Sequence, residues 1–169
     1  MVLASVMSIL GSEQSMRFIL IDKIHELEPG KQIKASKTLP AHEELFRDHF
    51  PGFPVVPGVL LTEMMAQAAG RCLDADGSHP GRAMLGKING ASFRDWVKPD
   101  EEIIIHAKIA QNRPTYATAD CFAEVGGKKV CSAELFFVFA PHEQFAPNAH
   151  DEILNNYWKA NPGMQPKQA

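Results

Sequence analysis

The pattern of hydrophobic and polar positions predicts one long apolar helix among several strands. The helix begins at about Gly58 and is apolar on every side as far as Leu73, which is typical of a helix buried inside a domain. Its main polar side chains are Glu63, Gln67 and Arg71, which are spaced four residues apart and therefore share one stripe. A carboxylate on such a helix is costly to bury unless it is paired, hydrogen-bonded or protonated, so the pattern suggests a use for Glu63.

The chain before this helix predicts a hairpin followed by a stiff loop. Residues 17–24 and 31–38 flank a Pro-Gly turn dipeptide and are expected to pair as strands. Residues 50–57 contain three prolines, each of which fixes φ and removes a backbone donor, so a rigid irregular loop is expected there. The last of them, Pro57, is well suited to the first position of the helix.

Four strands are expected after the helix. We place them at about these positions: residues 84–93, 102–111, 116–125 and 128–139. Gly126 and Gly127 between the last two are a strong signal for a two-residue hairpin turn. One strand has small residues at alternate positions, namely Ala117, Ala119, Cys121 and Ala123. That face of the sheet could lie close against a helix.

Length and charge indicate one compact domain. The 169 residues can bury a substantial core, and no linker or repeat divides them. We expect an N-terminal extension at 1–15, the folded domain at 16–140, and a C-terminal extension at 141–169 with a short helix at 151–159. The net charge of −3 does not suggest nucleic acid as a partner, and no apolar run is long enough to predict a membrane span.

Cysteine and histidine spacing argues against metal or cofactor chemistry. Cys72, Cys121 and Cys131 lie in apolar surroundings without metal-ligand spacing, so they are expected to be reduced core residues of a cytoplasmic protein. The first ten residues lack the basic region of a secretory signal. The histidines show no HExxH pattern, and neither a metal nor another cofactor is expected.

The segment 49–70, HFPGFPVVPGVLLTEMMAQAAG, carries the candidate chemistry. It places His49 and Glu63 at the two ends of the proline-rich turn, so that two proton-transfer groups are set around an apolar space. The segment resembles the FabZ-type 3-hydroxyacyl-acyl-carrier-protein dehydratases, whose signature is His-Phe-Pro, a Pro-Gly-Val helix start, and Glu followed by Met-Ala-Gln. One extra Met stands between Glu63 and Ala66.

The resemblance covers roughly residues 16–140. It implies an α+β hotdog fold, in which an antiparallel sheet wraps around a central apolar helix. Four positions depart from the residues expected in close relatives, namely Asn89, Ser92, Asp95 and Trp96, where Asp, Arg, Arg and Pro are expected. These departures affect partner and chain-length preference more than the chemistry.

Dehydration of a 3-hydroxyacyl thioester to a trans-2-enoyl thioester needs a base, an acid and a donor to the thioester oxygen. His49 is the best base, because imidazole titrates near the working pH. Glu63 is the best acid, or the holder of a water that acts as one. The N–H of Gly58, at the positive end of the helix, is the natural donor. Family resemblance supports these three roles.

Further residues are expected to support this site. Gln67 would orient the Glu63 carboxyl as its neighbour one turn along the helix. Phe50 and Val59 are expected to contact substrate. Other candidate liners of an acyl tunnel, each of which could equally belong to the core, are Phe53, Val56, Met64 and Met65.

The resemblance also implies partners. The substrate would be carried by acyl-carrier protein in fatty-acid or related lipid or polyene biosynthesis, with Arg94 and Lys98 as leading candidates for contacts to an acidic carrier. A homodimer, or an assembly of dimers, is implied in which the central helices lie together and His49 of one chain works with Glu63 of the other. Small residues would permit close helix approach, namely Ala66, Ala68, Ala69 and Gly70.

Two alternatives remain open. A hotdog thioesterase could use Glu63 and a bound water, although His49 would then lack an obvious role. A non-catalytic acyl-binding module is the other reading, and the joint presence of His49, Glu63, Gln67 and Gly58 argues against it.

Overall fold

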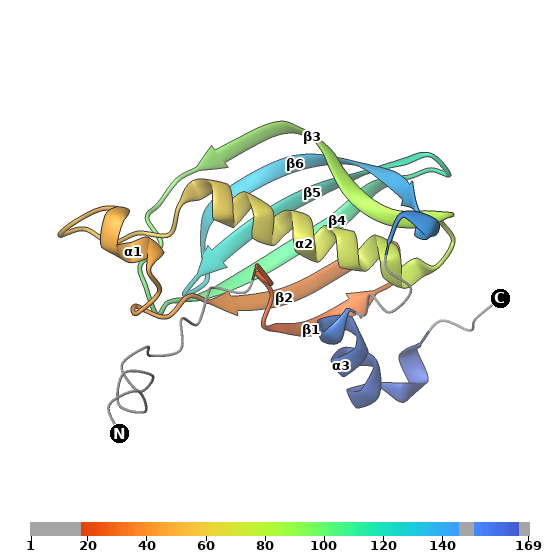
Figure 1. The fold of residues 1–169 in the computed structure, drawn as a ribbon, viewed down its shortest axis with the longest axis horizontal. Helices are drawn as coiled ribbons and strands as arrows, with labels where there is room; N and C mark the ends of the chain where they lie inside the picture. Colours follow the sequence, from red (N-terminus) through yellow and green to blue (C-terminus); the bar gives the residue numbers. More distant parts are fainter. Residues whose placement is uncertain (1–17, 146–150, 166–169) are drawn as a thin grey trace, which may run out of the picture.

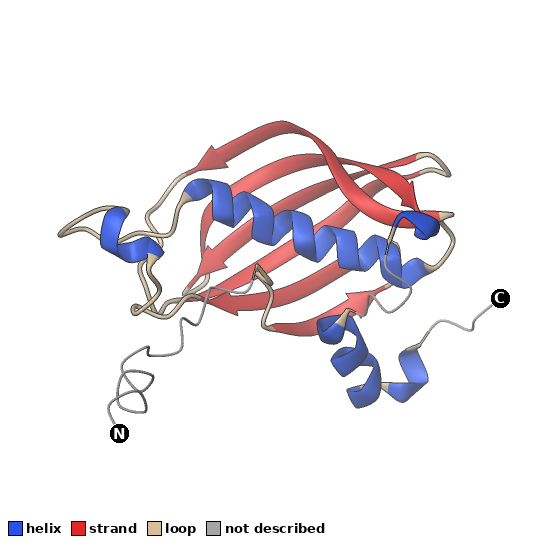
Figure 2. Ribbon diagram, viewed as in Figure 1, coloured by secondary structure: helices blue, strands red, loops and turns tan. Residues whose placement is uncertain are grey.

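The computed structural model of the protein describes residues 18–145 and 151–165, which form an α+β fold of the hotdog type. A six-stranded antiparallel sheet curves around one long helix (Figure 1, Figure 2). The elements follow in the order β1 (Lys23–Glu28), β2 (Gln32–Thr38), α1 (Leu45–Asp48), α2 (Gly58–Asp76), β3 (Gly81–Phe93), β4 (Glu102–Asn112), β5 (Tyr116–Val125), β6 (Lys128–Pro141), η1 (His142–Gln144), α3 (Glu152–Ala160) and η2 (Pro162–Met164). The strands lie side by side as β1-β2-β4-β5-β6-β3. Helix α2 packs against β2, β3, β4, β5 and β6, and Cys72 of α2 also donates to the carbonyl of Glu28 in β1.

The core lies between α2 and the sheet. Met65 and Leu73 of α2 are fully buried, as is Phe137 of β6. The four small residues of β5 are also buried, so their face does lie close to the helix as the sequence predicts. Small side chains at those positions let a helix pack closely against the strands.

One expectation about α2 is wrong. The helix begins at Gly58 as predicted, with Pro57 as its N-cap rather than its first residue, but it is not buried on every side. Val59 is 75% exposed, and the stripe of Glu63, Gln67 and Arg71 is only half-buried. In a single chain the sheet covers one side of the helix, so the opposite side stays open.

The first hairpin also differs from the prediction. Its first strand is β1, which begins at Lys23, whereas the sequence places it at 17–24. Glu28 pairs with Gln32 beside the turn, so β1 continues to the turn through mostly polar residues that the apolar pattern did not include. The apolar Leu20 and Ile21 are instead buried ahead of the strand.

The later strands are confirmed to within a few residues. Gly126 and Gly127 form the β5–β6 turn with φ of 58° and 77°, a conformation that glycine adopts without steric cost. Across residues 18–145 and 151–165, no helix is both long and apolar enough to cross a membrane.

The C-terminal segment packs against the domain. Asp151 caps α3 by accepting hydrogen bonds from the backbone of Ile153 and Leu154. Tyr157 and Trp158 are buried and join the core, and α3 contacts β1. The short helix expected at 151–159 corresponds to α3. The division of the chain into two extensions and a domain stays a prediction, and residues 1–15 lie outside the described residues.

Candidate active site

His49 lies where α1 ends and the proline-rich loop begins. Its N–H donates to the carbonyl of Leu45 at 3.1 Å, and its carbonyl accepts from the N–H of Val55 at 3.1 Å. Its imidazole Nδ1 lies 3.1 Å from the carbonyl oxygen of Val55. A carbonyl can only accept, so Nδ1 carries the hydrogen. In the neutral ring Nε2 then has a free lone pair, which is what a base requires.

Glu63 lies on α2, and its carboxylate is held from one side. Gln67 Nε2 donates to Glu63 Oε1 at 3.1 Å. Glu63 Oε2 has no hydrogen-bond partner among the described residues. The contact between Gln67 and Glu63 that the helical spacing predicts is therefore present, while its role in catalysis stays a prediction.

Gly58 is the first residue of α2, at the positive end of the helix dipole. Within the described part of the chain its N–H has no acceptor. A Cβ at this position would lie 3.0 Å from Cε1 of Phe93, closer than ordinary contact. The missing side chain therefore lets the Phe93 ring approach the start of the helix, and the N–H remains available to a ligand.

The expected substrate-contacting residues divide into two groups. Val59 is 75% exposed and Phe50 is 54% exposed, so both can meet a ligand or another chain. Phe53 is half-exposed, and the other candidate liners are buried in the core, namely Val56, Met64 and Met65. Val56, Met64 and Met65 are therefore core residues of the single chain.

His49 and Glu63 have separate surroundings in a single chain. The concave surface that includes Glu63 also includes Gln67, Arg71 and Phe137, and it does not include His49. No hydrogen bond joins the two side chains, both of which are described. The structure thus brings Glu63 and Gln67 together, and it does not bring His49 to them.

Two aromatic residues near the loop were not singled out as site residues from the sequence. Phe93 lies against Gly58, and Trp96 meets the ring of Phe53 edge-on at 6.2 Å between centroids. Trp96 is 67% exposed. The available signal was two aromatic residues where a predicted strand ends, but the sequence did not show that they lie near the start of α2.

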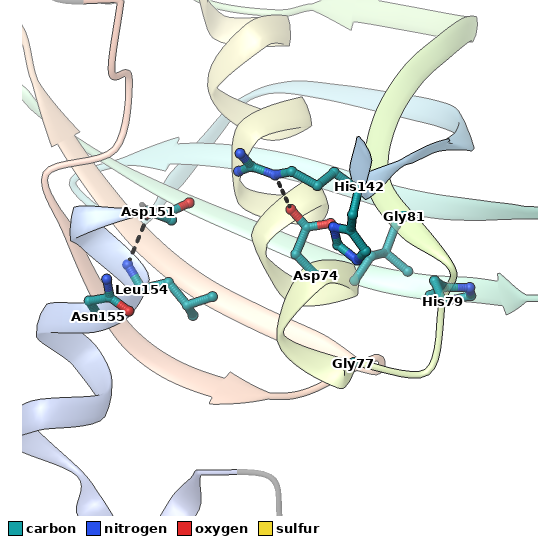
Figure 3. Close-up of a pocket in the computed structure, with 10 residues that line it drawn as sticks. Asp74, Gly77, His79, Gly81, His142, Asp151, Leu154 and Asn155 are labelled. Atoms are coloured by element: carbon teal, nitrogen blue, oxygen red, sulfur yellow. Dashed lines mark hydrogen bonds and ion pairs between the residues drawn. The ribbon is translucent and has the colours of Figure 1, made fainter. Parts of the chain in front are cut away.

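A polar pocket lies at the C-terminal end of α2, whereas Glu63 lies nearer the start of that helix (Figure 3). Asp74 lies there with Oδ2 3.4 Å from Arg82 Nε, while Oδ1 accepts from the N–H of Ala83 at 2.8 Å. Burial raises the pKa of the Asp74 carboxyl, and the hydrogen bond from Ala83 and the charge of Arg82 oppose that shift. Among the described residues, no cluster of His, Cys, Asp and Glu is arranged to hold a metal ion.

Comparison with known proteins relates most of the chain to one family. Residues 13–134 match the model of the FabA-like domain. The 3-hydroxyacyl-[acyl-carrier-protein] dehydratase FabZ of Pediococcus pentosaceus is 42% identical over 140 residues, covering 78% of this chain and 94% of the relative. The FabZ of Levilactobacillus brevis is 37% identical over 138 residues, covering 81% of this chain and 92% of the relative.

Solved structures show the same fold at low identity. The dehydratase heterocomplex ApeI:P from Xenorhabdus doucetiae has a TM-score of 0.58 at 12% identity, covering 72% of this chain and 83% of that one. A hypothetical thioesterase with coenzyme A from Streptococcus pneumoniae has a TM-score of 0.58 at 12% identity, covering 71% and 86%. These likenesses concern the fold alone, because the fold hosts more than one reaction.

Proposed function

Because the chain belongs to the FabA-like family, we propose that it dehydrates 3-hydroxyacyl thioesters on acyl-carrier protein to trans-2-enoyl thioesters. The observation that carries this proposal is the joint presence of His49 and Glu63 in a chain so similar to the FabZ relatives. The reaction serves fatty-acid or related lipid biosynthesis.

The proposed mechanism assigns each group one step. His49 Nε2 removes the proton α to the thioester carbonyl, and the electron pair of that C–H bond becomes the new carbon–carbon double bond. The β carbon–oxygen bond breaks, and Glu63 supplies the proton with which the hydroxyl leaves as water. The N–H of Gly58 donates to the thioester oxygen while negative charge develops there. Gln67 holds the Glu63 carboxyl, and Phe50 and Val59 contact the acyl chain.

The active site is proposed to be shared between two chains. Support comes from the separate surroundings of His49 and Glu63 within one chain. Further support comes from β3, a long edge strand whose residues 84–93 are all exposed, including Met84 and Ile88. An exposed apolar edge of this length is a surface that a second chain can cover.

One part of the expected dimer contact is wrong. Ala68 and Ala69 are fully buried against the chain's own core, so they do not offer a surface for another helix. Ala66 is buried as well, whereas Gly70, the fourth small residue of the expected contact, is half-buried, and the open side of α2 also carries the exposed Val59. The helical spacing alone did not reveal which side the sheet covers. A homodimer or an assembly of dimers stays a prediction, as do a cytoplasmic location and the absence of nucleic-acid and membrane partners.

Turnover of 3-hydroxyacyl-carrier substrates of several chain lengths tests the proposed reaction. Dehydration gives an enoyl thioester, whereas the thioesterase alternative releases free carrier. Enoyl product with at least one chain length is the expected result. If none forms with any length, the dehydratase proposal is wrong, and release of free carrier would favour the thioesterase.

A further inference from the structure

The polar stripe on α2 continues beyond Gln67 to Arg71, where it meets the segment that precedes α3. Arg71 Nη1 lies 3.4 Å from Gln67 Oε1, and Arg71 Nε lies 2.9 Å from Asp151 Oδ2. We propose that Asp151, acting through Arg71, fixes the side chain of Gln67 and so positions the Glu63 carboxyl for proton transfer. Arg71 and Asp151 are then positioning residues, and the inference rests on the proposed role of Glu63.

The side-chain amide of Gln67 is bonded at both ends. Its Oε1 accepts from the N–H of Leu20 at 2.9 Å as well as from Arg71, and its Nε2 donates to the carbonyl of Phe18 at 3.1 Å as well as to Glu63. A backbone N–H can only donate and a backbone carbonyl can only accept. The amide therefore has one possible orientation, which turns its NH₂ group toward Glu63.

Arg71 is one of the two donors that hold this orientation. It also donates to the backbone carbonyl of Gln67 at 3.2 Å. Its side chain is 12% exposed and that of Asp151 is 16% exposed, so the charges are largely shielded from water. A guanidinium in such a place needs a partner. Without Asp151 the guanidinium would lose its charged partner, and the amide would be left with its two backbone partners but without a fixed donor from Arg71.

Asp151 is itself fixed by the element that follows it. Its Oδ1 accepts from the N–H groups of Ile153 and Leu154 at the start of α3. The helix is anchored because Tyr157 and Trp158 are buried. The C-terminal segment is thereby linked to Glu63 through a continuous set of hydrogen bonds.

A purely structural role for the ion pair would leave the reaction rate unaffected, and α2 offers a matched control. Asp74 lies one turn beyond Arg71 and pairs with Arg82 at 3.4 Å, where the Arg82 side chain is 32% exposed and that of Asp74 is 20% exposed. Among the described residues Arg82 has no hydrogen bond to Gln67. Arg82→Met therefore removes another ion pair of α2 without removing any hydrogen bond of the proposed link.

The test measures kcat, KM and the unfolding midpoint for Arg71→Met, Asp151→Asn, the double variant, Arg71→Lys and Arg82→Met, with one 3-hydroxyacyl-carrier substrate. Asp151→Asn keeps a cap for α3, because asparagine also caps helices. The acid donates its proton in the transition state, so an acid held in the wrong position lowers kcat more than it changes KM. We expect each single change to lower kcat about tenfold with little change in KM. The double variant should be no slower than the slower single one, since both break the same link. Arg71→Lys should recover part of the rate, and Arg82→Met should lower the midpoint while keeping kcat.

Two results would overturn the inference. One is a normal kcat in both Arg71→Met and Asp151→Asn, and the other is an equal loss of kcat in Arg82→Met. Glu63→Gln, measured alongside, separates this inference from the proposed function. A normal kcat in Glu63→Gln would remove the proposed role of Glu63, and the positioning inference with it, while enoyl product from the unchanged protein would still support the proposed reaction. An inactive Glu63→Gln with a normal Arg71→Met removes the positioning role alone.

Discussion

At the scale of the residue, Glu63 has two oxygens in different environments. Gln67 binds Oε1, whereas Oε2 has no partner among the described residues. An amide at this position could still accept the hydrogen bond from Gln67 through its own oxygen. It has no acidic proton to give to a leaving hydroxyl.

We therefore predict that Glu63→Gln folds normally and loses most of its activity. The expected fall in kcat is on the order of a hundredfold or more, which is typical of losing a general acid. Steady-state kinetics and a thermal unfolding scan would measure the two properties. Turnover close to that of the unchanged protein would remove Glu63 from the proton-transfer step.

The three thiols give a second prediction at this scale. They are free and buried, and burial raises the pKa of Cys72 and Cys121 to about 12 and that of Cys131 to about 11. Only a very small fraction of each is thiolate at pH 8, and the thiolate is the reactive form. A thiol-specific chromogenic reagent should consume these cysteines only after denaturant is added. Rapid reaction of the folded protein would contradict this.

At the scale of the element, the connection between β3 and β4 carries exposed basic side chains. Arg94 is held at the end of β3 by a hydrogen bond from its N–H to the carbonyl of Val130, and Lys98 is held by a hydrogen bond from its N–H to Glu101. Asp95 between them is paired with Lys128 at 2.5 Å. Because Asp95 is paired with Lys128, it does not neutralise Arg94, and Arg94 and Lys98 are the two basic side chains of this connection that an acidic carrier could meet.

We predict that Arg94→Glu with Lys98→Glu raises KM for a carrier-bound substrate much more than for a coenzyme-A analogue. Charge complementarity acts mainly on encounter, so the difference should shrink at high salt. Lys108→Glu, at an exposed position of β4, is the matched control and should change neither KM. Equal effects on both substrates would argue against a carrier surface here.

At the scale of the whole molecule, a single chain leaves one side of α2 open and the edge strand β3 exposed. Within that chain, His49 does not belong to the concave surface that includes Glu63. A second copy could cover both surfaces and complete each site. Each dimer would then hold two sites, and each site would draw one residue from each chain.

We predict that His49→Ala and Glu63→Ala, each inactive alone, regain activity when unfolded and refolded together. A mixed dimer has one site with both groups intact and one with neither, so random mixing restores about a quarter of the normal activity. Each variant refolded alone is the control. If mixed dimers form and no activity returns, both residues act within one chain.

The sequence by itself determined the elements and the candidate chemistry. Local signals were sufficient where the cause is local: the Gly-Gly turn sets the β5–β6 hairpin, and the Pro-Gly-Val segment starts α2. The His49 and Glu63 pattern pointed to the family before any contact was known. The spacing of Glu63 and Gln67 predicted their hydrogen bond, because residues four apart on a helix are neighbours.

Only the tertiary structure decided which surfaces are covered. The first strand could not be placed from apolar residues alone, because Leu20 and Ile21 are buried by the fold without joining the ladder. The exposed side of α2 depends on where the sheet curves around it. Likewise the contact between Arg71 and Asp151 joins residues eighty positions apart. Such contacts depend on how the whole chain packs, and no local pattern in the sequence encodes them.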